Sequence, residues 1–387
     1  MWSSIGTAFV LGLFAMIGQS ATYPPPEALP SVKELPDPFL REDGSRIRSK
    51  REWERQRKAL LSKILHYEYG ELPPVPRNVR GEVFTTQELP NGIGVEQEIV
   101  LSMGPKRAVK THIQLAQPKG EGRYPVLITG DLGWGRIKPE IVAEIVRRGY
   151  ILVAFNREEI APDNATREGV YRAYPALDCG RLSAWAWGYH RVIDYLSTLS
   201  NVDTAHIGVT GHSRGGKAAL VAGATDTRIA LTAPNNSGCG GAGCYRIIND
   251  KCEDIRVIVK NFPFWFTPRF HEFIGRIDQL PFDQHTLKSV IAPRALLSTE
   301  ALGDLWANPS GTQITYSASK QVFDFLGAGE KIGIHFREGG HEHNLQDWKT
   351  LLDFADKQFF RKQTSTDFTR LVFPNAEKGH SWEIPSK

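Results

Sequence analysis

One serine has a spacing that suits nucleophilic catalysis. Residues 206–220 read HIGVTGHSRGGKAAL, in which Gly211, Ser213 and Gly215 form the pattern G-x-S-x-G. In that pattern a tight strand-to-helix turn raises the serine hydroxyl above the edge of a parallel sheet. β-Branched residues before the turn favour a strand, and the alanines after it favour a helix. The same letters also suit an ordinary strand-turn-helix connection, so the serine needs partners elsewhere in the chain.

A serine nucleophile needs a histidine base, and three candidates lie near the last predicted strand. His335 belongs to the strand pattern KIGIHF, where a histidine is typical of a packed core. His341 follows a pair of glycines just past that strand, so its ring can reach back over the sheet edge. His343 is the competing candidate, and placement favours His341.

The histidine in turn needs a carboxylate that fixes its tautomer and stabilises the imidazolium. In chains with this serine turn, the acid precedes the histidine. Glu300 and Asp304 occur in the letters STEALGDLW, at and after the end of a predicted strand. Asp304 falls within the loop, whereas Glu300 can still belong to the strand. We therefore predict a triad of Ser213, His341 and Asp304, with Glu300 as the alternative acid.

Alternating strands and helices are predicted to position these residues. Strands are predicted at 79–89, 95–103, 108–116, 124–130, 150–156, 206–211, 229–235, 294–300 and 331–336. Helices are predicted at 49–70, 138–149, 182–199 and 347–360, with a further one after the serine. The first three strands are expected to be antiparallel. The later alternation predicts an α/β-hydrolase fold, with a mostly parallel central sheet and helices on both faces in a three-layer αβα sandwich.

The first 21 residues differ from the rest of the chain. Their short apolar run ends in small residues, which predicts a cleaved signal peptide (1–21) and a secreted or periplasmic protein without stable membrane association. No Lys or Arg precedes Lys33, so the positive start typical of signals is missing, and an uncleaved anchor is the alternative. Residues 22–45 are proline-rich and predict an extended lead-in. Residues 46–387 are predicted to form a single catalytic domain, and the protein is expected to be a monomer.

Charge and cysteine content exclude several other classes of protein. The net charge is +4 over 387 residues and no basic stripe occurs, which argues against nucleic-acid binding. The four cysteines, which match no zinc template, predict a local disulfide or free thiols. They are Cys179, Cys239, Cys244 and Cys252. No metal or other cofactor is expected.

Several further segments match one known family, among them LSAWAWGYHRVIDYL, NSGCGGAGCYR, FPFWF, DLWANP and EGGHEHNLQDW. Through these segments the chain resembles the bacterial branch of the glucuronoyl esterases, over nearly all of its length after residue 21. The family's motif around the nucleophile, G-C-S-R-x-G-K, is matched by Ser213, Arg214, Gly216 and Lys217. The resemblance implies a serine esterase of the α/β-hydrolase fold. Its implied substrate is an ester of (4-O-methyl-)glucuronic acid on glucuronoxylan, as in lignin–carbohydrate linkages.

The resemblance also implies roles for three side chains. Arg214 would help its own backbone N–H to stabilise the oxyanion, Lys217 would bind hydroxyls of the uronic acid ring, and Trp306 would border the sugar. Taken alone, the same residues suit plainer roles. These are a surface ion pair for Arg214, an exposed helix lysine for Lys217, and a core residue for Trp306.

Two positions depart from the family pattern. His212 replaces the cysteine before the serine, so the disulfide of fungal members cannot form. Asn236 stands where many members carry the catalytic glutamate, but some bacterial members place the acid in a motif like D-L-W, which Asp304 begins here. Two alternatives therefore remain. One is an acetyl or feruloyl xylan esterase with the same triad, and the other is an inactive carbohydrate-binding relative.

Overall fold

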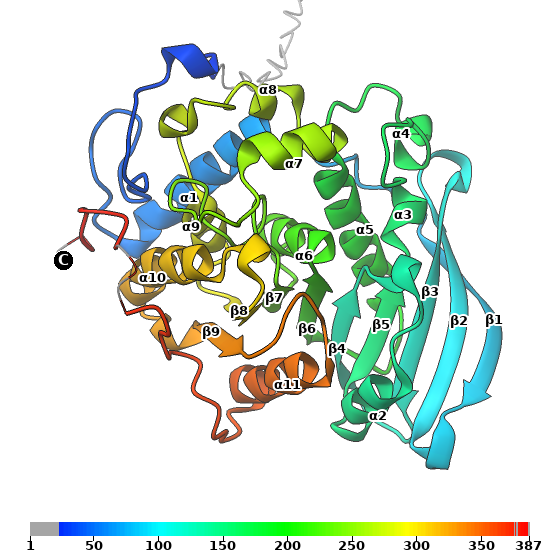
Figure 1. The fold of residues 1–387 in the computed structure, drawn as a ribbon. Helices are drawn as coiled ribbons and strands as arrows, with labels where there is room; N and C mark the ends of the chain where they lie inside the picture. The colour runs from blue at the N-terminus through cyan, green and yellow to red at the C-terminus, as the bar shows by residue number, and fades with distance from the viewer. Residues whose placement is uncertain (1–22, 375, 377, 386–387) are drawn as a thin grey trace, which may run out of the picture.

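A nine-stranded sheet runs through the centre of the molecule (Figure 1). The computed structural model describes residues 23–374, 376 and 378–385, so the predicted signal peptide lies outside the described residues. The strand order is β1-β2-β3-β5-β4-β6-β7-β8-β9. The strands are β1 (Arg80–Glu88), β2 (Gly94–Met103), β3 (Val109–Pro118), β4 (Tyr124–Thr129), β5 (Ile151–Phe155), β6 (Val202–His212), β7 (Leu231–Asn235), β8 (Ala295–Ala301) and β9 (Ile332–Arg337). β1, β2, β3 and β5 pair antiparallel, and the pairs from β5 to β9 are parallel.

Helices cover both faces of the sheet, as the sequence predicts. They are α1 (Lys50–Ile64), α2 (Pro139–Arg147), α3 (Arg157–Ile160), α4 (Val170–Ala173), α5 (Arg181–Leu196), α6 (Arg214–Thr225), α7 (Ile255–Asn261), α8 (Pro268–His271), α9 (Gln284–Ser289), α10 (Pro309–Leu326) and α11 (Leu345–Phe360). Apolar residues of α2 and α11 pack with Leu127 and Leu152 on one face. Those of α5 and α6 pack with the alternate residues Ile128 and Val153 on the other. The predicted three-layer α/β-hydrolase fold is therefore confirmed.

Helix α10 is not predicted by the sequence pattern. Its first half, PSGTQITYSAS, is rich in serine, threonine and glycine, which are weak helix formers. Two features stabilise it nevertheless. The Asn308 side chain accepts the N–H of Gly311 at the start of the helix, and Val322 and Phe323 are fully buried in the core. Tertiary packing thus outweighs local preference in this segment.

None of the helices in the described part of the chain combines the length and apolarity needed to cross a bilayer. All four cysteines are free thiols, as one of the two predicted alternatives states, and they form no local disulfide. Cys179, Cys239 and Cys244 are buried, and Cys252 is partly buried. Burial raises the pKa of all four, which keeps them protonated and unreactive at neutral pH.

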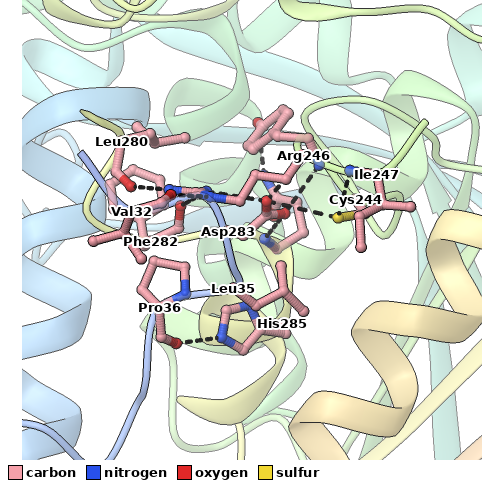
Figure 2. Close-up of polar contacts among 12 residues, drawn as sticks. Val32, Leu35, Pro36, Cys244, Arg246, Ile247, Leu280, Phe282, Asp283 and His285 are labelled. Carbon is pink, nitrogen blue, oxygen red and sulfur yellow. Dashed lines mark hydrogen bonds and ion pairs between the residues drawn. The ribbon is translucent and has the colours of Figure 1, made fainter. Parts of the chain in front are cut away.

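The lead-in before α1 contacts the rest of the protein beside a buried ion pair (Figure 2). Arg246 Nη1 lies 3.2 Å from Asp283 Oδ2, and both side chains are almost fully buried. Arg246 Nε donates to the backbone oxygen of Val32 (3.2 Å), and His285 Nε2 lies 2.8 Å from that of Pro36. The proline-rich segment therefore packs against the loop that precedes α7 and against α9.

Removing the carboxylate of this pair should destabilise the protein strongly. Asp283→Ala would leave the Arg246 guanidinium buried without its counter-ion, so we expect the free energy of unfolding to fall by roughly 3–5 kcal/mol. The matched control is Asp324→Ala, which breaks an exposed pair with Lys320 and should cost about 0.5 kcal/mol. Denaturant unfolding followed by circular dichroism measures both. Equal losses in the two variants would contradict a structural role for the buried pair.

Candidate active site

The predicted serine turn is present at the end of β6. Ser213 adopts φ +55° and ψ −123° between the strand and the first residue of α6. A side chain on Gly211 would meet the backbone of Gly215 at 2.4 Å, and one on Gly215 would meet Asp131 Oδ1 at 2.0 Å. Both glycines are therefore needed for strand and helix to approach so closely. The positive φ of a non-glycine residue at this point is the strained geometry of a nucleophile elbow.

A buried carboxylate, that of Asp131, accepts a backbone hydrogen bond from this turn. Asp131 Oδ2 accepts the backbone N–H of His212 (2.8 Å), and its Oδ1 lies 2.6 Å from Arg157 Nη1. The guanidinium of Arg157 is fully buried and lies over the rings of Trp134 (4.1 Å) and Trp185 (5.2 Å). The loop after β4 thus holds the residue that precedes the serine. Sequence reasoning missed this pair, because nothing in the chain marks two residues 26 positions apart as partners.

The structure brings His341 and Asp304 together. His341 Nδ1 lies 2.5 Å from Asp304 Oδ2, and the side chains are 42% and 3% exposed. The two loops that carry them follow the neighbouring strands β9 and β8 and are joined by backbone hydrogen bonds. One of these runs from Gly303 N to Gly339 O (2.9 Å). The histidine therefore has a buried carboxylate at one nitrogen and solvent access on its other side.

The competing candidates occupy other environments. His343 stacks on Trp348 with 4.8 Å between ring centroids, and burial lowers its pKa to about 3. His335 is half-buried within β9. Glu300 lies within β8 and is fully buried. Burial raises the pKa of the Glu300 carboxyl, while the neighbouring Lys288 ammonium opposes that rise. The carboxylate hydrogen-bonded to His341 is thus that of Asp304.

One cavity of about 280 Å³ collects most of the predicted residues. It is lined by Ser213, Arg214, Lys217, Asn236, Ser237, Gly238, Glu253, Asn261, Phe262, Trp265, Trp306, Ala307 and His341. These residues come from five separate parts of the chain, which the parallel strands bring to one edge of the sheet. Among the described residues, no group of three or more His, Cys, Asp or Glu side chains is arranged to hold a metal ion.

Arg214 is held beside the serine by an acid that the sequence did not reveal. Its Nη1 lies 2.6 Å from Asp163 Oδ2, and Asp163 Oδ1 accepts the indole N–H of Trp265 (2.7 Å). The guanidinium also lies 4.9 Å above the rings of Phe262 and Trp265. Its Nε is buried and has no hydrogen-bond partner among the described residues. The arginine is therefore fixed in place by Asp163 and by two aromatic rings.

Lys217 is buried in the cavity wall, so the alternative of an exposed helix lysine is wrong. Its Nζ donates to the backbone oxygens of Ser237 (2.7 Å) and Cys239 (2.5 Å). Since an ammonium has three N–H groups, one remains for the cavity side. There Glu253 Oε2 lies 3.7 Å away, and burial raises the pKa of Glu253 while Lys217 opposes that rise. Sequence reasoning missed Glu253, which belongs to no motif.

The tryptophans divide between the cavity and the core. Trp306 is 49% exposed at the cavity mouth, so the alternative of a core tryptophan is wrong for this residue. Trp265 lines the same cavity from within and is nearly buried. Trp185 and Trp187, on α5, are fully buried and pack in the core. An exposed ring and a buried ring thus border the space above Lys217.

Known proteins share both the sequence and the fold. The family described as glucuronyl esterase, fungi, matches residues 100–327, which is more than half of the chain. A 4-O-methyl-glucuronoyl methylesterase from Podospora anserina is 33% identical, over 92% of this chain and 75% of that protein. A carbohydrate esterase family 15 glucuronoyl esterase from Caldicellulosiruptor kristjansonii has a TM-score of 0.78 and 29% identity, covering 93% and 99% of the two chains.

A third relative was solved with a sugar ester bound. This glucuronoyl esterase from Sporotrichum thermophile, in complex with methyl 4-O-methyl-β-D-glucopyranuronate, has a TM-score of 0.74 and 25% identity, covering 91% of this chain and 94% of that chain. The resemblance seen in the sequence is therefore confirmed at the level of family. Because the family model matches more than half of the chain and a relative is 33% identical over most of it, the chain belongs to the glucuronoyl esterases, a family of carboxylic ester hydrolases.

Proposed function

We propose that this protein hydrolyses esters of (4-O-methyl-)glucuronic acid on glucuronoxylan, as in lignin–carbohydrate linkages. The observation that carries the proposal is the single cavity in which Ser213, His341, Arg214 and Lys217 meet. The serine and histidine supply ester hydrolysis, and the buried lysine supplies contacts that a simple acyl group does not need. The names of the relatives, 4-O-methyl-glucuronoyl methylesterases, support the same substrate class.

In the first half of the reaction Ser213 Oγ attacks the ester carbonyl carbon. His341 accepts the hydroxyl proton on Nε2, because its Nδ1 is engaged by Asp304. When the tetrahedral intermediate collapses, His341 returns that proton to the departing alcohol oxygen. The products of this half are the free alcohol and a glucuronoyl ester on Ser213.

The negative charge on the carbonyl oxygen needs preorganised donors. We assign the backbone N–H of Arg214, directly after the nucleophile, and the guanidinium of the same residue. The guanidinium suits this role because Asp163 fixes its position in the wall of the cavity that Ser213 also lines. Each such donor contributes about 3 kcal/mol to the stability of a transition state of this kind.

In the second half a water molecule attacks the acyl-enzyme. His341 removes one proton from the water, and the hydroxide adds to the carbonyl carbon beside the same donors. Collapse of this intermediate breaks the bond to Ser213 Oγ, which takes the proton back from His341. Glucuronic acid leaves, and the enzyme returns to its starting state.

The cavity wall offers groups that match a sugar ring. Lys217 supplies a hydrogen-bond donor and Glu253 an acceptor only 3.7 Å away, a spacing that can serve two neighbouring ring hydroxyls. Trp306 exposes its ring at the mouth of the cavity, where the apolar face of a pyranose can pack. We therefore place the uronic acid ring between Lys217 and Trp306, with its ester carbonyl toward Ser213.

Replacing Lys217 should separate glucuronate esters from simple esters. For Lys217→Ala we expect kcat/KM for benzyl glucuronate to fall about 30- to 100-fold, since a hydrogen bond to a charged group is lost. The rate on benzyl acetate should change by less than about threefold, because acetate has no ring hydroxyls. Lys217→Met removes the charge but keeps the side-chain volume, so it controls for collapse of the cavity in the alanine variant. Initial rates on both esters, with benzyl alcohol measured by chromatography, give the comparison.

Two other results would contradict the proposal. Equal loss on both esters would make Lys217 a structural residue and favour an acetyl or feruloyl xylan esterase. Binding of glucuronate without hydrolysis by the wild-type protein would identify an inactive carbohydrate-binding relative.

A further inference from the structure

The ring of His341 needs more than one contact to stay in position. Its loop contains Gly339, at φ +104°, and Gly340, and the side chain is 42% exposed. Asp304 holds the ring at one atom, Nδ1, and a single hydrogen bond leaves the ring free to tilt about that atom. Because proton transfer depends on the position of Nε2, a tilt of this kind would slow the reaction.

A second histidine covers one face of that ring. The ring centroids of His212 and His341 are 4.5 Å apart, with the planes tilted by 46°. His212 is the residue directly before the nucleophile, so one strand end carries both the serine and this contact. The contact therefore links the orientation of the base to the position of Ser213.

The ring of His212 is itself immobilised. Its Nδ1 donates to Asn235 Oδ1 (2.7 Å), because Asn235 uses its Nδ2 to donate to Thr299 Oγ1 (2.9 Å). Its backbone N–H is held by Asp131. The side chain is thus fixed by the neighbouring strands β7 and β8 as well as by its own.

Aromatic rings also support His212 on its other sides. His343 stacks with it at 5.8 Å and 24°, and His343 in turn stacks on the buried Trp348. Trp134 contacts it edge-on at 6.2 Å. Trp348, His343, His212 and His341 thus form a series of neighbouring rings that begins in the core and ends at the exposed base.

Burial favours the neutral form of His212 while His341 takes up a proton. Burial is the largest cause of the lowered pKa of His212, and a positive charge on His341 lowers that pKa further, whereas the hydrogen bond to Asn235 and the carboxylates of Asp131 and Asp304 act in the opposite direction. His343 also stays neutral, since burial lowers its pKa to about 3, and Arg337 acts in the same direction. The imidazolium that forms on His341 therefore faces no second cation in this series of rings.

We propose that His212 is a positioning residue that holds the imidazole of His341 in the plane required for proton transfer. This inference rests on the proposed function, because it assigns His212 a role through His341. The planar ring is the feature that matters, and the ability of histidine to titrate is not used.

The test compares substitutions that differ in the ring they leave behind. For His212→Ala we expect kcat on benzyl glucuronate to fall about 10- to 100-fold with KM changed by less than about twofold. His212→Phe restores a flat ring and should recover kcat to within about threefold of wild type. His212→Leu fills the volume without a flat ring and should resemble the alanine variant. His335→Ala is the matched control, because this half-buried histidine lies in β9 away from the cavity, and it should leave kcat unchanged.

A spectroscopic measurement separates this inference from the proposed function. The proton shared by His341 Nδ1 and Asp304 gives a low-field NMR line, which should broaden in His212→Ala and sharpen again in His212→Phe, whether or not a substrate is known. A line as sharp in His212→Ala as in wild type would overturn the inference. Equal kcat values for the phenylalanine and leucine variants would also overturn it, and remain informative if the alanine variant does not fold.

Discussion

Ser213→Ala is expected to lower kcat/KM for a glucuronate ester by a factor on the order of 10⁴–10⁶. The hydroxyl is the group that forms the covalent intermediate, and no neighbouring side chain can replace it in the same position. The backbone of the elbow, with φ +55°, tolerates alanine as well as serine, so the fold should be kept. Chromatographic release of benzyl alcohol measures the rate, and circular dichroism checks the fold.

Ser237→Ala provides the matched control for this experiment. Ser237 lines the same cavity, but its hydroxyl accepts the backbone N–H of Ala242. Loss of that one hydrogen bond should reduce the rate by less than about tenfold. Substantial activity left in Ser213→Ala, or equal losses in the two serine variants, would contradict a covalent mechanism at Ser213.

Asp304→Asn should lower kcat by roughly 10⁴-fold while leaving the fold intact. An amide at this position favours the wrong tautomer of His341 and cannot stabilise the imidazolium that forms during both proton transfers. The 2.5 Å contact and the burial of Asp304 make this effect large, because little water is available to take its place. Steady-state rates on benzyl glucuronate at pH 7 measure the loss.

Glu300→Gln is the control that decides between the two acids. Glu300 is the alternative acid that the sequence left open. It lies four positions before Asp304 and is fully buried in β8 beside Lys288. We expect its replacement to change kcat by less than about tenfold, although stability falls because Lys288 loses a partner. A reversed order of the two losses would show that Glu300 is the acid.

A carboxylate at position 236 should partly compensate for the loss of Asp304. Asn236 lines the cavity with His341, and its side chain accepts the backbone N–H of Ala301, at the end of β8, and donates to the backbone oxygen of Glu342, in the loop after β9. In the Asp304→Asn background, Asn236→Glu is therefore expected to recover part of the lost rate. No recovery would mean that a side chain at 236 cannot reach the imidazole.

Local sequence signals predicted the serine turn and the two loops of the candidate site. The G-x-S-x-G turn depends on neighbours within five residues, so Gly211 and Gly215 reveal it directly. The alternation of strands and helices predicted a parallel sheet. Because the loops after parallel strands lie at the same edge of a sheet, it also predicted where His341 and Asp304 meet.

The residues that sequence reasoning missed are held by long-range contacts. Asp163 pairs with Arg214 although the two are 51 positions apart, and the sequence of the loop that carries Asp163 is that of an ordinary polar turn. The burial of Lys217 depends on the carbonyl oxygens of Ser237 and Cys239, which a pattern of side-chain types cannot show. Such pairings follow from the topology of the whole sheet and from backbone direction, and neither is encoded in short spacings.

The most direct test of the central claim is a competition between two esters. Wild-type protein is mixed with equal concentrations of benzyl glucuronate and benzyl acetate, and the early release of glucuronic acid and acetic acid is measured from the same tube. Their ratio gives the ratio of kcat/KM values, which we predict to exceed about 100 in favour of glucuronate. Equal release, a preference for acetate, or no release of either acid would contradict the assignment of this protein as a glucuronate-specific serine esterase.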